Sequence, residues 1–395
     1  MPGSTRRVAV VGVGVVAACG VGREAFWHGL FHRPADGDVR QLEFWDPSPW
    51  FDSPKDARRS DRFSQFALAA TAEALEQAGE LEVDPARCGV MIGTGIGGIG
   101  TNEEQIVTRH DRGDRRVSPF LIPMMMPNAA AASVSMRHGF QGPCEAVVTA
   151  CAAGTHSIGN AINAIRYGRT DAMIAGGSEA PITPTALAGF RNMTAMSTSG
   201  VSMPFDIRRD GFVISEGAGI LVLEEWEHAV ARGATILAEA LGSASTADAH
   251  HITAPAPGGM GAVRCMELAL EDAGLAAADL MHINAHGTST PLNDAAEAHA
   301  IAKVFGDHGP VVTSTKGVTG HALGAAGALE AAAVVLSMQH RLIPPTLGLE
   351  QRDPELPSID IVTDVAGRSW EPGPAMSNSF GFGGHNGSIV ISPAR

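Results

Sequence analysis

Two short motifs of matching form place a cysteine and a histidine at equivalent positions of the chain. The first is Thr149-Ala-Cys151-Ala-Ala-Gly154, and the second is Thr319-Gly-His321-Ala-Leu-Gly324. Each opens a stretch rich in Ala and Gly that is typical of a buried helix, and the first follows an apolar run expected to be a strand. The repeat indicates a duplicated fold whose active site lies where the two halves meet.

Cys151 is the candidate nucleophile. The N-terminus of a helix offers unpaired N–H groups and partial positive charge, which stabilise a thiolate and can hold an oxyanion. The strand-to-helix turn and the matching histidine favour this role over that of a buried structural cysteine. The structural interpretation is the ordinary one, and it is adopted for the other cysteines: Cys19, Cys88, Cys144 and Cys265.

Two histidines are the candidate partners of this thiol. His286 lies in Asn284-Ala-His-Gly-Thr-Ser-Thr290, directly after a predicted strand, where α/β folds present functional groups. His321 begins its own helix, where the dipole lowers the pKa of the imidazole and keeps it neutral. One thiol and two neutral imidazoles suit thioester chemistry, because one ring or both can donate a hydrogen bond to the thioester carbonyl as negative charge develops there.

Metal and dinucleotide sites are the other interpretations of these motifs. No carboxylate or thiol stands at ligand spacing around His250-His251, so no metal is expected. Gly93-Thr-Gly-Ile-Gly-Gly98 is a literal GxGxxG, and Gly12-Val-Gly-Val-Val-Ala17 is a looser match. A dinucleotide site needs a second strand that ends in an acidic residue about 20 residues later. Asp111 and Asp114 follow no predicted strand, so an NAD(P)-dependent oxidoreductase is a remote alternative.

Predicted strands and helices alternate in both halves of the chain, which indicates an α/β fold with a mostly parallel sheet in each half. We place the boundary near residue 240. Residues 1–240 then form an N-terminal half that carries the cysteine, and residues 241–395 form a C-terminal half that carries both histidines. Strands are predicted at 7–12, 88–93, 171–176, 217–224, 236–241, 281–285 and 388–391, helices at 60–79, 261–273 and after residue 321, and a strand, turn and helix at 147–169.

The bulk composition is that of a globular chain with reduced thiols. The 395 residues are 45% hydrophobic and 18% charged, enough for a large core or two domains. A net charge of −14 argues against a nucleic-acid partner. The five cysteines form no CxxC pair, and neither a secretion signal nor a bilayer-length apolar run is present. A cytoplasmic protein without a membrane segment is therefore predicted.

Taken together, the motifs resemble those of the β-ketoacyl-acyl-carrier-protein synthases, the condensing enzymes of the thiolase superfamily. The resemblance is closest to the elongating type II enzymes of bacteria and extends to the ketosynthase subunits of type II polyketide synthases. It implies a thiolase-like, five-layered αβαβα fold built from two duplicated halves. Four ordered blocks carry it over nearly the whole chain: Thr149–Cys151, Asn284–Pro291, Lys316–His321 and Asn378–Gly384.

The resemblance implies a decarboxylative Claisen condensation with no bound cofactor and no metal. Cys151 would take the acyl chain from its carrier as a thioester. His286 and His321 would bind the malonyl thioester and stabilise the enolate left by loss of CO₂. The enolate would attack the acyl-Cys151 carbonyl and give a 3-ketoacyl product on a growing fatty acid, polyketide or polyene chain. The backbone N–H groups of Cys151 and Phe382 would form the oxyanion hole.

Five further positions match supporting residues of this family. Lys316 and Glu330 match a pair that orders the site around the second histidine. Phe382 matches a gate residue over the nucleophile. Thr288 and Thr290 match positions that bind the phosphopantetheine arm supplied by the acyl carrier protein. An ordinary ion pair and an ordinary core aromatic are the structural alternatives for the first three.

Protein partners are also implied: an acyl carrier protein, and a second subunit in a homodimer or in a heterodimer with a chain-length-factor-like subunit. Asn102 falls where many elongating enzymes carry an apolar residue at the floor of the acyl pocket, near the dimer interface. The length and identity of the acyl chain that the pocket accepts therefore do not follow from the sequence. A catalytically silent partner subunit is the alternative function, and the intact cysteine and histidines argue against it. Candidate docking residues for an acidic carrier protein are basic: Lys55, Arg58, Arg59, Arg115 and Arg116.

Overall fold

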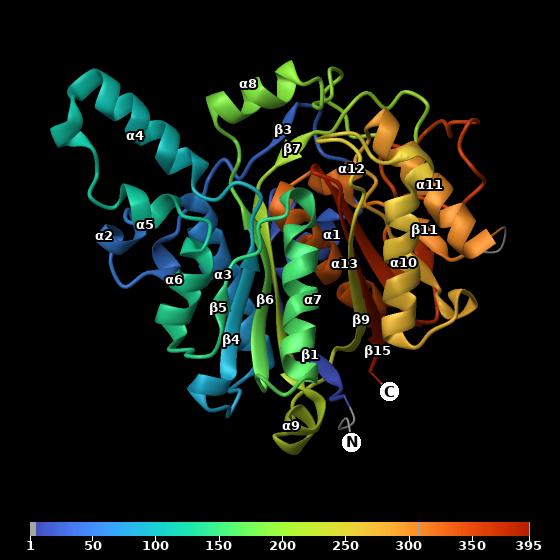
Figure 1. Cartoon of the computed structure of the whole chain (residues 1–395), viewed down its shortest axis with the longest axis horizontal. Coiled ribbons are helices and arrows are strands. Elements are labelled where there is room, and N and C mark those ends of the chain that lie inside the picture. Colours follow the sequence, from blue (N-terminus) through green and yellow to red (C-terminus); the bar gives the residue numbers. More distant parts are fainter. Residues whose placement is uncertain (1–4, 307–308, 395) are drawn as a thin grey trace.

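The main sheet of the chain is continuous and has eleven strands, and it divides into two parts with the same strand order, called the first and second sheet below. The structure is a computed structural model and describes residues 5–306 and 309–394. One sheet belongs to each half of the chain, and the two meet where β1 pairs with β9 (Figure 1). Their strands are β1 (Val8–Ala17), β4 (Cys88–Gly93), β5 (Cys144–Glu145), β6 (Ala172–Glu179) and β8 (Gly217–Glu225), then β9 (Ala238–Ala247), β10 (His282–Asn284), β11 (Val311–Thr313), β14 (Ala375–Gly381) and β15 (His385–Pro393).

The strand order repeats between the halves. It is β5-β4-β6-β8-β1 in the first and β11-β10-β14-β15-β9 in the second. Counted along the chain, each half therefore has the order third, second, fourth, fifth, first. The division at residue 240 falls within β9 and stays a prediction.

Both sheets are mixed, so the expectation of mostly parallel sheets is wrong. β4 runs parallel to β5 and β6, and β10 runs parallel to β11 and β14. The pairs nearest the junction, β6–β8, β8–β1, β14–β15 and β15–β9, are antiparallel. One cause is direct: only residues 382–384 separate β14 from β15, and so short a connection joins antiparallel strands.

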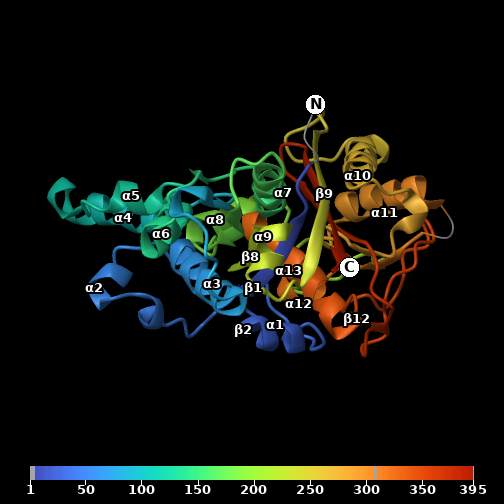
Figure 2. The same ribbon diagram turned by 90° about the horizontal axis from the view of Figure 1, so that it is seen from below.

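Helices cover and separate the sheets in five layers (Figures 1 and 2). α3 (Arg62–Ala78) and α6 (Ala129–His138) lie on the outer face of the first sheet. α7 (Ala153–Arg166) and α13 (Ala326–His340) lie between the sheets, and each contacts strands of both. α10 (Met260–Ala273) covers the outer face of the second sheet beside α11 (Pro291–Phe305). The αβαβα architecture implied by the resemblance is confirmed.

The two central helices can approach closely because they begin with small residues. Every residue of α13 from Ala326 to Met338 is buried, as expected for a helix that is apolar on all sides. A Cβ atom added to Gly154 of α7 would lie 2.8 Å from the carbonyl oxygen of Gly324. The two motifs that match in sequence are therefore packed against each other.

The remaining elements lie outside these layers: β2 (Gly20–Val21), α1 (Arg23–Gly29), β3 (Val39–Arg40), α2 (Pro54–Ala57), α4 (Ile99–Arg112), α5 (Leu121–Met125), α8 (Pro184–Asn192), β7 (Ile214–Ser215), α9 (Trp226–Ala231), α12 (Lys316–Thr319), β12 (Leu342–Ile343) and β13 (Arg368–Ser369). Among them, α4 projects from the body of the molecule together with α5, and Thr101 is the buried residue of α4 (Figure 1). Within the described residues, no helix is both long and apolar enough to cross a membrane.

Candidate active site

Short 3-10 turns of the same form lead into the two central helices. Ala150–Ala152 leads into α7, and Leu323–Ala325 leads into α13. The first residue of each turn, Ala150 or Leu323, has a φ of 50° or 44°, in the left-handed region that residues with a Cβ rarely adopt. Cys151 lies inside its turn, whereas His321 lies two residues before the other, so the equivalence of these two positions expected from the sequence motifs is wrong.

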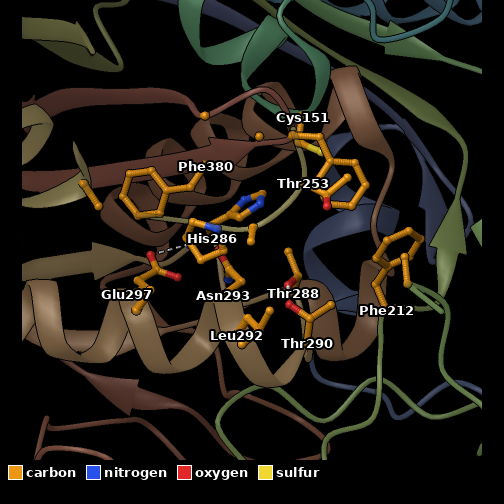
Figure 3. Close-up of a pocket in the computed structure, with 18 of the residues that line it drawn as sticks. Cys151, Phe212, Thr253, His286, Thr288, Thr290, Leu292, Asn293, Glu297 and Phe380 are labelled. Atoms are coloured by element: carbon orange, nitrogen blue, oxygen red, sulfur yellow. Dashed lines mark hydrogen bonds between the residues drawn. The ribbon is translucent and has the colours of Figure 1, made fainter. Parts of the chain in front are cut away.

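The structure brings Cys151, His286 and His321 together. His321 Nε2 lies 3.0 Å from the Sγ atom of Cys151. The rings of His286 and His321 are nearly perpendicular, with centroids 5.3 Å apart. One donor atom from each of the three residues lies within 4.8 Å of the others, and all three residues are buried. All three line one cavity of about 350 Å³. Figure 3 shows Cys151 and His286 on its wall.

A buried ion pair stands beside His286. Lys316 Nζ donates to the carboxylate of Glu330, to the main-chain oxygen of His286 at 2.6 Å and to Nδ1 of the same ring at 3.3 Å. Because an ammonium group only donates, Nδ1 accepts and the proton of the neutral ring lies on Nε2. Neither Lys316 nor Glu330 lines the cavity. The hydrogen bonds of Lys316 are made to His286, whereas the resemblance implied a pair that orders the site around His321.

Lys316 also bears on metal binding. A thiol and two imidazoles at this separation match the donor set of a zinc site. A cation there would face the Lys316 ammonium group, which already contacts one of the imidazoles. Like charge therefore disfavours a metal and favours an anionic reaction centre.

Burial controls protonation at the site. It raises the pKa of Cys151 to about 11, and the Phe382 main chain and the Lys316 charge offset this only in part. The thiol is therefore protonated at neutral pH, and the expectation of a thiolate stabilised by the helix terminus is wrong. Burial, with the Lys316 charge, holds the pKa of His286 and of His321 well below the ordinary value. Both rings are neutral as predicted, although burial and Lys316, not the helix dipole, are the cause.

The other predicted cavity residues divide into two groups. Thr288 and Thr290 line the cavity, with their hydroxyl oxygens 2.9 Å apart (Figure 3). Phe382 also lines it and packs in an apolar cluster with Cys151. Asn102 lies on α4 and is absent from the cavity wall described above. Its role in substrate binding stays a prediction.

Glu297 is a site residue that the sequence analysis missed. Its carboxylate accepts hydrogen bonds from the main-chain N–H groups of His286 and Gly287, both at 2.7 Å. Burial raises its pKa to about 8. The sequence feature that could have indicated Glu297 is its position one helical turn after Asp294, on the helix that follows the Thr-rich loop. Two buried acids at this spacing share a helix face.

The GxGxxG sequence of residues 93–98 binds a carboxylate of the protein itself. Glu179 accepts hydrogen bonds from the main chain of this loop and from Gly324 N at 2.9 Å. The following helix begins at Ile99, after the glycines and not inside them. The looser match at residues 12–17 lies wholly within β1. Because the N–H groups that a dinucleotide phosphate would need are used internally, the oxidoreductase alternative is not supported.

The predicted docking residues form two runs on the surface. Residues 55–59 lie on and just after α2, and residues 115–116 lie between α4 and α5. The guanidinium of Arg59 stands over the ring of Phe120, 4.2 Å from its centroid, which brings the first run beside the segment that follows the second. All five basic side chains are exposed. Their role in docking stays a prediction.

Sequence comparisons identify the family. Residues 33–229 match the beta-ketoacyl synthase N-terminal domain, and residues 237–350 match the beta-ketoacyl synthase C-terminal domain. The 3-oxoacyl-[acyl-carrier-protein] synthase 2 of Synechocystis sp. is 44% identical over 410 residues, or 98% of each chain. The protein of the same name from Staphylococcus aureus is 49% identical over 346 residues, or 85% of each chain.

Solved structures agree. The ishigamide ketosynthase/chain length factor superposes with a TM-score of 0.91 at 32% identity, over 99% of this chain and 100% of that chain. A type II polyketide ketosynthase in complex with its acyl-carrier protein superposes with a TM-score of 0.89 at 33% identity, over the same shares. The chain that holds this buried thiol between two imidazoles therefore belongs to the β-ketoacyl synthase family, the condensing enzymes of the acyltransferase class.

Proposed function

We propose that Cys151 accepts an acyl chain from an acyl carrier protein and that malonyl-acyl-carrier-protein then extends this chain in a ping-pong cycle. The observation that carries the proposal is the convergence of one thiol and two neutral imidazoles on a single cavity. No resident cofactor is needed, because the phosphopantetheine arm arrives with the carrier. Thr288 and Thr290 on the cavity wall are the residues proposed to contact that arm.

In the first half-reaction, the protonated thiol of Cys151 attacks the acyl thioester. His321 Nε2, 3.0 Å away, takes the proton as the C–S bond forms. The main-chain N–H groups of Cys151 and Phe382 hold the tetrahedral oxyanion, and the Phe382 main chain already lowers the pKa of the thiol. The carrier's thiolate leaves and recovers the proton from the imidazole.

In the second half-reaction, the malonyl thioester loses CO₂. The electron pair of the broken C–C bond stays on the substrate as an enolate, whose oxygen accepts the Nε2–H of His286. The enolate carbon attacks the acyl carbonyl on Cys151. The C–S bond to Cys151 breaks and its electron pair stays on the sulfur, so the 3-ketoacyl chain remains on the carrier. The thiolate takes up one proton from water, and the thiol is regenerated.

Substitution of Cys151 tests this assignment. We expect Cys151→Ala to abolish self-acylation, measured as the mass added to the protein by an acyl thioester. We expect Cys151→Gln, whose amide imitates the acylated cysteine, to retain CO₂ release from malonyl-acyl-carrier-protein. Retained condensation in either variant would refute the role of Cys151. Absence of labelling of the wild type by cerulenin would favour the alternative of a silent partner subunit.

The carrier protein is proposed to dock on the exposed basic residues at 55–59 and 115–116. An acidic carrier complements this charge, and one of the structural relatives is a ketosynthase in complex with its acyl-carrier protein. We place the enzyme in the cytoplasm, where its cysteines stay reduced.

A second subunit is proposed to pair with the β5 edge. This strand is exposed and ends the first sheet beside α6, α5 contacts α6 in turn, and α4 and α5 expose Ile106, Val107 and Ile122. The subunit is a second copy of this chain or a chain-length-factor-like protein, because structural relatives include ketosynthases titled with such a factor. Native mass measurement of the chain, alone and with a co-expressed partner, distinguishes the two.

A further inference from the structure

His156 links the nucleophile turn to the opposite half of the chain. It lies on α7, one turn beyond Cys151, and 8% of its surface is exposed. Its Nδ1 lies 2.8 Å from the hydroxyl oxygen of Thr149, two residues before the nucleophile. Its Nε2 lies 3.0 Å from the main-chain oxygen of Asn386, on β15. One imidazole therefore spans the seam between the halves.

The two partners fix the tautomer of this ring. A carbonyl oxygen only accepts, so Nε2 carries a proton and donates it to Asn386. Burial lowers the pKa of His156, which favours the neutral ring. Nδ1 then accepts, and the Thr149 hydroxyl donates to it. Each link thus has a defined direction, and the side chain of Thr149 is held in one orientation.

The far end of the link supports the hairpin that carries Phe382. Asn386 pairs with Phe380 across the hairpin and donates from its side chain to Asp248 at 2.8 Å. A Cβ atom added to Gly381, on the same hairpin, would lie 3.0 Å from the main-chain nitrogen of Cys151. The hairpin and the nucleophile turn are therefore in contact, and the imidazole fixes how they are placed relative to each other.

The opposite strand leaves room for this ring. A Cβ atom added to Gly387, the residue after Asn386, would lie 2.9 Å from both Cδ2 and Nε2 of His156. Any larger residue at 387 would displace the ring. This close approach of Gly387 is a separate observation from the two hydrogen bonds, and it also indicates that the His156 ring is held in one position between the two halves.

From this geometry we infer that His156 is a positioning residue, which sets the separation between the main-chain N–H groups of Cys151 and Phe382. The inference rests on the proposed function, in which these two groups hold the oxyanion on the acyl carbon. Loss of the link would impair the steps that pass through this oxyanion, namely acyl transfer to Cys151 and carbon–carbon bond formation. Decarboxylation of the malonyl thioester, which depends on His286, would be spared.

Substitutions at residue 156 separate the two hydrogen bonds. The Gln amide N–H₂ group can replace Nε2 as the donor to Asn386, but nothing then accepts from Thr149. The Asn amide oxygen can replace Nδ1 as the acceptor from Thr149, but nothing then donates to Asn386. We expect His156→Ala to slow self-acylation by about a hundredfold, the scale of a 1 Å misplacement at a reacting centre. The Gln and Asn variants should show smaller losses. CO₂ release from malonyl-acyl-carrier-protein should stay within about twofold of wild type.

Thr149 supplies the matched control. Thr149→Val removes the donor at nearly constant volume and should slow acylation, whereas Thr149→Ser should restore it. The double variant His156→Gln, Thr149→Val should slow self-acylation no more than the more severe single change does, because both changes remove the same hydrogen bond between Thr149 and His156. If His156→Ala does not fold, the Thr149 variants and the Gln and Asn variants at residue 156 still test the inference. Unchanged acylation in a folded variant, or a parallel fall in decarboxylation, would overturn the inference. Absent acylation in the wild type would instead overturn the proposed function.

Discussion

At Cys151 the reactive group is a protonated thiol beside a neutral imidazole. A thiol with a pKa of about 11 reacts only when a base removes its proton during attack, and His321 lies at hydrogen-bonding distance to do so. The residue types and their order along the chain were enough to predict this partnership. The protonation state could not be predicted in the same way, because it depends on burial, which the tertiary packing creates.

Alkylation of Cys151 should therefore accelerate steeply with pH. The pKa is raised, so the thiolate fraction is small at pH 7 and increases about tenfold per pH unit until the pH approaches that pKa. The rate of carbamidomethylation by iodoacetamide, followed on the peptide that contains Cys151, measures this. The Cys151→Ala protein supplies the background from other thiols. A rate that levels off below pH 8 would contradict the protonated thiol.

The ion pair of Lys316 and Glu330 gives the second prediction at this scale. Glu330→Ala leaves a buried ammonium group unpaired and should lower the free energy of unfolding by about 3–5 kcal/mol. The double variant Lys316→Met, Glu330→Gln should recover part of that loss. It should not recover decarboxylation, because nothing then holds the His286 proton on Nε2. Denaturant unfolding measures the loss of stability, and CO₂ release measures the loss of decarboxylation. A Glu330→Ala protein as stable as wild type would refute the predicted stabilisation by the ion pair.

At the scale of elements, the crossing of α7 and α13 positions the site. Local patterns predicted several of these elements well: the strand at 88–93 was found at those residues, and the helix at 60–79 was found at 62–78. The strand expected at residue 147 is absent, because β5 ends at Glu145 and Val147 keeps only a hydrogen bond from Thr94. Strand direction was misjudged because the antiparallel pairs β8–β1 and β15–β9 join strands that are far apart in the chain, and the alternation of elements does not fix the direction of such pairs.

Gly154→Ala should disturb this crossing. The added methyl group would meet the carbonyl oxygen of Gly324 at 2.8 Å, so the helices must separate. We expect a loss of about 1–3 kcal/mol in stability, despite the better helix propensity of Ala, and slower self-acylation. Gly189→Ala on α8 is the control, since a Cβ atom there meets nothing within 4 Å and should be neutral or stabilising. Equal melting temperatures of the two variants would show that the contact is unimportant.

At the scale of the whole molecule, charge distribution directs the choice of partner. A net charge of −14 would repel an acidic carrier, so the proposed docking requires a local basic surface. The sequence indicated the candidate docking residues because they are basic in an acidic chain. It could not show that Arg59 contacts Phe120, since that contact forms only in the folded protein. A second subunit was predicted, but the surface proposed to bind it was not, because an exposed strand edge is defined only by the folded sheet.

Charge reversal at Arg58 and Arg59 tests the docking surface. The double change to Glu should raise KM for malonyl-acyl-carrier-protein about tenfold at low salt and less at high salt, because exposed charges are screened. Turnover of a small thioester without carrier protein should be unchanged. Arg169→Glu is the control, since this exposed arginine follows the end of α7 that points away from Cys151, about 20 Å along the helix. An equal effect of the control would count against a specific surface.

The shared seam has a consequence for how the protein is made. The strand β9 and everything after it must fold before either imidazole reaches the thiol. A ribosome that has delivered only the first sheet has therefore produced a cysteine with no base beside it. The chemistry is withheld from the nascent polypeptide until the second sheet has docked, so unfinished copies do not capture acyl groups from the cell's carriers.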